Sequence, residues 1–168
     1  MNMSVFYFPR PMRYYLTHPL KFFSDIGRML RRARQRAVYG WCDMDTWEMD
    51  AWFLEVVPRM LRKLATDGRG YPGYGKWDSP EKWNSYLFSL ADKFSSMTEE
   101  STEARNRYSQ KYNDSIMSLD VGKINEDNSF KELSKKYFEE WTRLSEENKE
   151  TKKEAFEMLC ECFDSLWD

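Results

Sequence analysis

The chain has 168 residues, of which 17% are aromatic and 32% are charged. This length fits one domain with a real hydrophobic core, and this mixture differs from that of a disordered chain. No apolar run approaches the roughly 18 residues that a membrane-spanning helix needs, so we expect no membrane partner. The charges are divided unevenly, since residues 1–40 hold eight Lys or Arg against one Asp and residues 99–168 hold eleven against eighteen acids. This polarity predicts either a basic binding face or two parts of one fold that attract each other.

The N-terminal segment, MNMSVFYFPRPMRYYLTHPL, is aromatic, is interrupted by prolines and lacks the features of a signal peptide. We expect an extended arm that packs on the body through Phe6, Phe8, Tyr14 and Tyr15. Three cysteines, an odd number, favour reduced thiols in a cytoplasm. Because His18 is the only histidine, a zinc site with four nitrogen or sulfur ligands is not expected, and neither is any other cofactor.

Apolar residues at spacings of three and four predict a first helix over residues 19–38. Thr17 is expected to cap its start and Gly40 to end it. Arginines cover much of the remaining circumference, namely Arg28, Arg31, Arg32, Arg34 and Arg36. Arg28, Arg31 and Arg32 are the candidate contacts for nucleic-acid phosphates. In the alternative interpretation, which we prefer, they are partly neutralised by the acidic C-terminal half.

A second helix is predicted over residues 46–65, with Asp45 as the first residue of a D-x-x-E capping box. Pro58 lies inside this pattern and is expected to kink the helix. Asp43, Asp45 and Asp50 could together hold a hard cation through oxygen ligands. The helix dipole explains the same cluster more simply, because it favours acids at a helix N-terminus.

Two further helices are predicted over residues 80–97 and 130–165, with Ser79 and Ser129 as their caps. The polar segment after the third helix either continues it or follows a break near Ser95–Thr98. The fourth helix is either continuous or broken near Asn148.

Almost no stretch alternates with a period of two, so we predict an all-α fold of about four helices. The expected organisation is a single domain, residues 1–168. A subdivision into residues 1–97 and 98–168 is possible on the charge pattern.

Residues 68–77 read GRGYPGYGKW, which contains both G-x-x-x-x-G-K and G-x-G-x-x-G. Both nucleotide-binding motifs need a strand before the loop, whereas the pattern here predicts a helix. Trp77 also stands where a phosphate loop needs Ser or Thr. We therefore predict no nucleotide site but an aromatic connector, in which Tyr71, Tyr74 and Trp77 fold onto the helices. Because loops often carry function, these three residues are also candidate binding residues.

Two blocks, GWCDMDTWEMDAWFLEVVPRML and GYPGYGKWDSPEKWNSYLFSLADKF, together resemble a group of small bacteriophage-encoded proteins. The shared pattern is G-[FW]-x-D-x-D-x-W-x-[LM]-D, then P-R-[LM], G-Y-P and E-x-W. The resemblance covers residues 40–97 and implies phage origin and helical structure. It implies no mechanism, because the group has no established activity. The matching residues are Gly40, Trp41, Asp43, Asp45, Trp47, Met49, Asp50, Pro58, Arg59, Met60, Gly70, Tyr71, Pro72, Glu81 and Trp83.

The sequence favours binding over catalysis. It offers no Ser–His–Asp or Cys–His set, and the only carboxylates that suggest acid–base work are Asp50 and Glu55, beside tryptophans. The surplus of Trp and Tyr suits protein interfaces. We therefore predict a phage accessory protein that binds a host or phage protein in the host cytoplasm, and a counter-defence role is one form of this. The alternatives are nucleic-acid binding by the first helix and a metal-dependent enzyme that uses the Asp43, Asp45 and Asp50 cluster.

Overall fold

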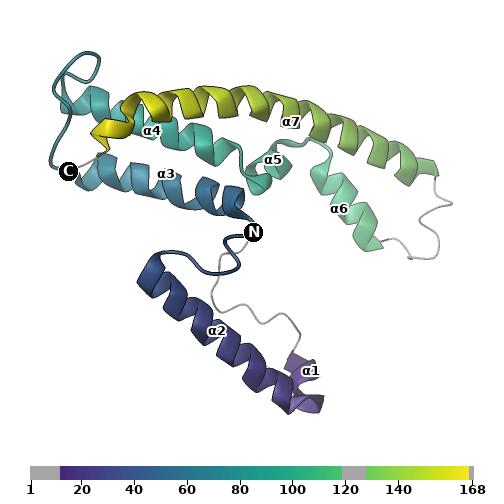
Figure 1. The fold of residues 1–168 in the computed structure, drawn as a ribbon. Coiled ribbons are helices and arrows are strands. Elements are labelled where there is room, and N and C mark those ends of the chain that lie inside the picture. The colour runs from purple at the N-terminus through teal and green to yellow at the C-terminus, as the bar shows by residue number, and fades with distance from the viewer. Residues whose placement is uncertain (1–11, 119–127, 167–168) are drawn as a thin grey trace. The chain divides into compact units, whose positions relative to one another are not determined.

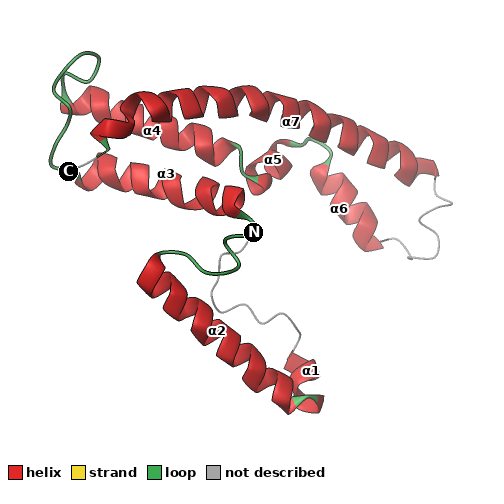
Figure 2. Ribbon diagram, in the orientation of Figure 1, coloured by secondary structure: helices red, strands yellow, loops and turns green. Residues whose placement is uncertain are grey.

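The computed structural model describes residues 12–118 and 128–166, and every regular element within these ranges is a helix (Figure 1, Figure 2). The prediction of an all-α fold is confirmed, with seven α-helices in the described residues where the sequence suggested about four. In chain order the elements are α1 (Met12–Thr17), α2 (Pro19–Tyr39), α3 (Met49–Asp67), α4 (Pro80–Ser96), α5 (Glu99–Arg105), α6 (Ser109–Ser118), α7 (Asn128–Cys162) and the 3₁₀ helix η1 (Phe163–Ser165). No helix in the described ranges is long and apolar enough to cross a membrane.

The chain divides into two compact units, residues 1–52 and residues 53–168. This boundary differs from the subdivision at residue 97 that the charge pattern suggested. The second unit keeps residues 53–97 with the C-terminal half because α3, α4 and α7 contribute to one hydrophobic core.

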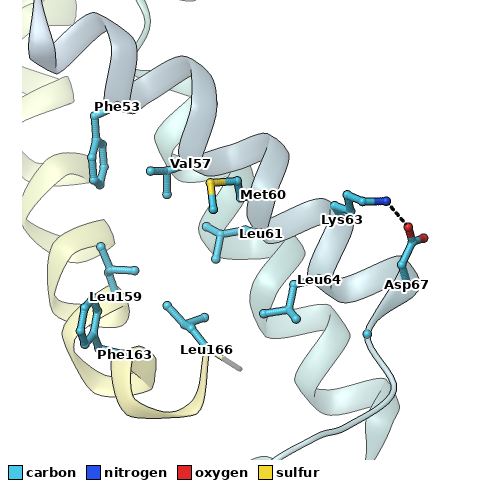
Figure 3. Close-up of a pocket in the computed structure, with 11 residues that line it drawn as sticks. Phe53, Val57, Met60, Leu61, Lys63, Leu64, Asp67, Leu159, Phe163 and Leu166 are labelled. Carbon is cyan, nitrogen blue, oxygen red and sulfur yellow. Dashed lines mark hydrogen bonds and ion pairs between the residues drawn. The ribbon is translucent and has the colours of Figure 1, made fainter. Parts of the chain in front are cut away.

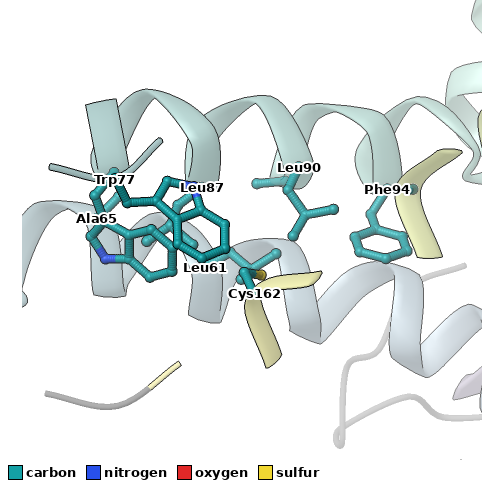
Figure 4. Packing of buried hydrophobic residues seen from close by; sticks show 10 residues of the cluster. Leu61, Ala65, Trp77, Leu87, Leu90, Phe94 and Cys162 are labelled. Carbon is teal, nitrogen blue, oxygen red and sulfur yellow. The ribbon is translucent and has the colours of Figure 1, made fainter. Parts of the chain in front are cut away.

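The core of the second unit is centred on α4 (Figure 4). Trp83, Leu87, Leu90 and Phe94 recur at spacings of four, three and four, so they lie on one helix face, and all are fully buried. Their partners include Leu61 and Ala65 of α3, Trp77, and Ala155 and Cys162 of α7. The predicted start of this helix is also confirmed, since the Ser79 side chain accepts a hydrogen bond from the backbone N–H of Lys82.

The starts of α2 and α3 differ from the predictions, whereas the end of α2 agrees. Thr17 is the last residue of α1, and His18 holds the N-cap position of α2. Asp45 does not cap α3, which begins at Met49, because its carboxylate accepts hydrogen bonds from Arg36 and from the backbone N–H of Cys42. Gly40 ends α2 as predicted, with the left-handed backbone (φ 78°) that glycine adopts readily.

The two open questions about helix breaks are resolved. α4 ends at Ser96, and the Thr98 side chain caps α5 by accepting from the backbone N–H of Ser101 at 3.2 Å, so the chain breaks where one alternative placed it. α7, in contrast, is continuous. Its polar middle packs against α5, where Asn148 donates to the Thr102 hydroxyl at 2.8 Å. Ser129 lies inside α7 and not at its cap.

Two further expectations concern Pro58 and the N-terminal arm. α3 continues through Pro58, whose side chain is fully buried. Tyr14 and Tyr15 lie on α1 and not on an extended arm, because the segment between Pro11 and Pro19 contains no proline that would prevent a helix. Phe6 and Phe8 lie outside the described residues.

Within the first unit, Tyr15 joins α1 to α2. Its ring is buried and meets the ring of Phe22 edge-on at 5.6 Å, and its hydroxyl donates to Asp25 at 2.8 Å. Asp25 is itself buried and also accepts from Arg28.

Candidate functional site

An apolar groove of about 510 Å³ opens in the second unit between α3 and the C-terminal end of α7 with η1 (Figure 3). Most of its lining side chains are aliphatic or aromatic. The lining consists of Phe53, Val57, Met60, Leu61, Lys63, Leu64, Asp67 and Gly68 on one side, and Leu159, Phe163 and Leu166 on the other. A concave apolar surface of this size is typical of a binding site.

Apolar residues on one side of α3 form the first wall of the groove, and some of them lie outside the buried core. Phe53, Val57, Leu61 and Leu64 recur at three and four residues, so they lie on one face of the helix. Leu61 points into the core and is buried, whereas its neighbour Met60 is 64% exposed at the edge of the groove. Methionine is flexible and polarizable, which suits a surface that adapts to a partner.

The opposite wall is formed where the chain leaves α7. The buried thiol of Cys162 lies 3.5 Å from the carbonyl oxygen of Leu159, and the chain then tightens into η1. Phe163 consequently lies beside the groove with 65% of its surface exposed. The Ser165 hydroxyl shares a 3.0 Å hydrogen bond with the Tyr74 hydroxyl, which fixes this wall to the glycine-rich loop, residues 68–77.

The polar part of the groove is an ion pair at its edge. Lys63 and Asp67, one helical turn apart on α3, pair with each other, and this contact raises the pKa of the lysine and lowers that of the aspartate. The other side chains of the lining are apolar. The groove therefore provides apolar contact area and orientation, and its lining supplies no nucleophile paired with a base.

The glycine-rich loop is anchored to the body of the second unit. Trp77 is only 6% exposed and packs edge-on against the rings of Trp83 and Tyr86, each at 5.2 Å between centroids. The Lys76 ammonium lies 4.5 Å from the centroid of the Tyr86 ring and pairs with Glu161 of α7. Lys76, the lysine of the G-x-x-x-x-G-K pattern, thus holds the loop against α7, in agreement with the predicted aromatic connector.

The three candidate residues of this loop have different environments. Tyr71 and Tyr74 are exposed, and the Tyr74 hydroxyl is engaged by Ser165. Trp77 belongs to the hydrophobic core, as expected for a connector residue that folds onto the helices, and its role as a binding residue stays a prediction.

The three candidate arginines of α2 are engaged to different degrees within the first unit. Arg28 pairs with Asp25, and Arg31 donates to Asp43 at 2.8 Å. Arg32 is half-buried and has no ion pair with any residue of the described ranges. Two of the three charges that were candidates for phosphate binding are therefore already balanced locally.

Two of the three candidate metal ligands, Asp43 and Asp45, are engaged by side chains of α2. The Asp43 carboxylate accepts hydrogen bonds from Arg31 and, at 2.7 Å, from Gln35. The Asp45 carboxylate accepts two hydrogen bonds from Arg36, from Nη2 at 2.6 Å and from Nε at 3.2 Å. Burial alone would raise the pKa of Asp45, but the bonds from Arg36 and Cys42 outweigh it and lower that pKa. Asp50 lies in the first turn of α3. In the described part of the chain, no three His, Cys, Asp or Glu side chains gather in a metal-binding arrangement.

The sequence analysis did not identify the groove, although apolar residues at helical spacing line it. The sequence feature that indicated the groove was a long run of apolar residues at helical spacing in residues 53–64 and another in residues 159–166. The spacing does not specify which of these residues stay outside the core, because that depends on how the helices pack.

Comparison with known protein families, with curated proteins and with solved structures finds no match for this chain.

Proposed function

We propose that this chain is a phage accessory protein that acts in the host cytoplasm by binding a host or phage protein, and not by catalysis. The observation that carries the proposal is the apolar groove with Met60 and Phe163 exposed at its edges. Large exposed apolar side chains around a concave apolar surface favour contact with another protein.

The occupant that suits this groove is the apolar face of one amphipathic helix of the partner. Such a helix places residues at i, i+3, i+4 and i+7 into a hydrophobic groove, which needs apolar walls and few polar groups. Complete burial of Met60 or Phe163 would contribute about 1.5–3 kcal/mol each. The Lys63–Asp67 pair lies at the edge of the groove, where a polar flank of the helix would meet it.

Two alternatives have less support. Catalysis would need reactive groups in the groove, and the lining residues provide only the edge ion pair. Nucleic-acid binding would draw on Arg28 and Arg31, which would first have to leave Asp25 and Asp43.

Affinity capture from a lysate of the bacterial host, with and without nuclease, tests the proposal. The bait is the full chain, as wild type and as the groove variants Met60→Glu and Phe163→Glu. We expect a protein, identified by mass spectrometry, that survives nuclease treatment and is lost with both variants. The matched control is Phe138→Glu, an exposed phenylalanine of α7 outside the groove, which should retain the partner. A partner that is retained by both groove variants, or that disappears with nuclease, would contradict the proposal.

A further inference from the structure

A second apolar surface runs along α2, in the first unit. Six positions follow the alternating three- and four-residue spacing of a coiled-coil seam, and we call them the α2 seam. They are Leu20, Phe23, Gly27, Leu30, Arg34 and Ala37. The helix geometry places the seam roughly opposite Asp25, the side to which α1 is joined by Tyr15.

Within its unit the seam is open. Leu20 is 84% exposed, Phe23 68% and Leu30 62%. Three large apolar side chains exposed in one row of a helix are more than the scattered exposure that a protein surface ordinarily shows. Val38, 62% exposed, lies on the same side of the helix five turns after Leu20, so the exposed apolar face runs along the length of α2.

Gly27 provides an independent observation at the centre of the seam. Glycine inside a helix is destabilising relative to alanine, so its presence needs a reason. Apart from its two chain neighbours and the backbone of its own helix, no atom of the described residues lies within 4 Å of the place that a Cβ would occupy at Gly27, so packing among these residues does not explain the glycine. A missing side chain between Phe23 and Leu30 leaves a notch into which a large side chain, or the backbone of a second helix, can fit.

The charge around the α2 seam indicates which kind of partner helix would pack on it. Residues 12–39 hold seven Lys or Arg against the single acid Asp25, and residues 40–52 of the same unit add four acids, so residues 12–52 carry a net charge of +2. Arg34 lies in the seam, is exposed and has no ion pair with the described residues, whereas Arg31 beside it pairs with Asp43. A partner helix with acidic residues at the positions flanking its apolar line would complement this charge.

We propose that the α2 seam packs against an amphipathic helix of a partner protein, with Leu or similar residues along its contact line and Glu or Asp on its flanks. This surface is separate from the groove, so the inference goes beyond the proposed function and stands or falls independently of it. A second copy of this chain is disfavoured because α2 offers no acidic side chain beside its seam, since its single acid, Asp25, lies on the opposite side of the helix. A lipid surface is disfavoured because interfacial helices present a continuous apolar face, whereas the charged Arg34 interrupts the exposed row here.

The test uses the full chain and two synthetic helical peptides of about four heptads. Both carry Leu at the contact positions, one has Glu on its flanks and the other has Lys. Fluorescence anisotropy measures the dissociation constants. We expect the Leu/Glu peptide to bind at least about tenfold more tightly than the Leu/Lys peptide, since like charges at the flanks oppose association.

Substitutions in the seam make the test specific. Phe23→Ala with Leu30→Ala should weaken the Leu/Glu peptide by at least about tenfold, whereas Tyr39→Ala, an exposed side chain of α2 off the seam, should not. Arg34→Glu should weaken binding of the Leu/Glu peptide and strengthen binding of the Leu/Lys peptide. Gly27→Gln should raise the thermal stability of the helix and yet weaken binding, which a purely structural role of Gly27 would not produce.

Several results would overturn the inference. These are equal binding of the two peptides, no binding of either, and binding that the seam variants leave unchanged. Sedimentation of the chain alone and co-sedimentation with phosphatidylserine vesicles complete the test. A seam-dependent dimer or seam-dependent vesicle binding, without preference for the Leu/Glu peptide, would assign the surface to a second copy or to a lipid surface instead.

Discussion

Glu140 is the buried charge that joins α7 to the connection between α5 and α6. Its carboxylate receives two hydrogen bonds from Arg107, at 3.2 and 3.0 Å, and two from Arg143, both at 3.1 Å. These contacts, first from Arg143 and then from Arg107, lower the pKa of Glu140 to about 2. A paired carboxylate of this kind stabilises the fold only while it is ionised.

The first prediction is that Glu140→Gln removes part of the acid sensitivity of this protein. Since the folded pKa lies below the ordinary value of 4.5, the contribution is complete above that value and is lost as the pH falls through about 2. The wild-type free energy of unfolding should therefore decrease from about pH 5 downward, and more steeply than that of Glu140→Gln. Urea denaturation at a series of pH values measures this slope.

The control is Glu139→Gln, on the adjacent position of the same helix. Glu139 is well exposed and has one pair with Lys135, at 3.8 Å. This variant should keep the wild-type slope. Identical slopes for wild type and Glu140→Gln would show that the acid sensitivity arises from other carboxylates.

At the scale of the elements, α4 is the helix on which the second unit depends. It lies against α7 and supplies the largest buried side chains of the core. Leu90→Ala, at a position with no exposed surface, should cost about 2–5 kcal/mol because it leaves a cavity among α3, α4 and α7. Met60→Ala, at the exposed edge of the groove, should change stability by less than about 0.5 kcal/mol. Chemical denaturation of both variants measures these differences, and similar costs would mean that Met60 belongs to the core.

α4 also shows what local sequence can specify. Ser79 and Pro80 mark its start, and four apolar residues at helical spacing mark its buried face, so both could be predicted without the structure. α3 differs because Asp45, which resembles a cap, is engaged by Arg36 of another helix. Such a long-range contact leaves no local signal. The groove also depends on long-range contacts, since only the packing of α3 against α7 decides that Met60 and Phe163 stay exposed.

At the scale of the whole molecule, ion pairs within each unit offset part of the charge polarity of the sequence, which leaves residues 1–52 with a net charge of +3 and residues 53–168 with −5. Acidic residues of α7 pair with basic residues of α4, of α5 and of the glycine-rich loop, as in the pairs Lys93–Glu154, Arg105–Glu147 and Lys76–Glu161. In the first unit, arginines of α2 pair with Asp25, Asp43 and Asp45. Pairing between the arginine-rich helix and the acidic C-terminal half stays a prediction.

This local pairing leads to the last prediction, on nucleic acid. Binding of duplex DNA through Arg28, Arg31 or Arg36 would require these arginines to exchange their carboxylate partners for phosphates, each exchange replacing one favourable contact by another. We therefore expect weak binding at about 50 mM salt, no measurable binding at about 200 mM, and little change in the triple variant Arg28→Ala, Arg31→Ala, Arg32→Ala. A titration across this range by fluorescence anisotropy measures the slope of log affinity against log salt. Free arginines would instead give tight binding, with a slope of about −0.9 for each phosphate contact. If that steep dependence were observed and were lost in the triple variant, nucleic-acid binding would replace protein binding as the leading function.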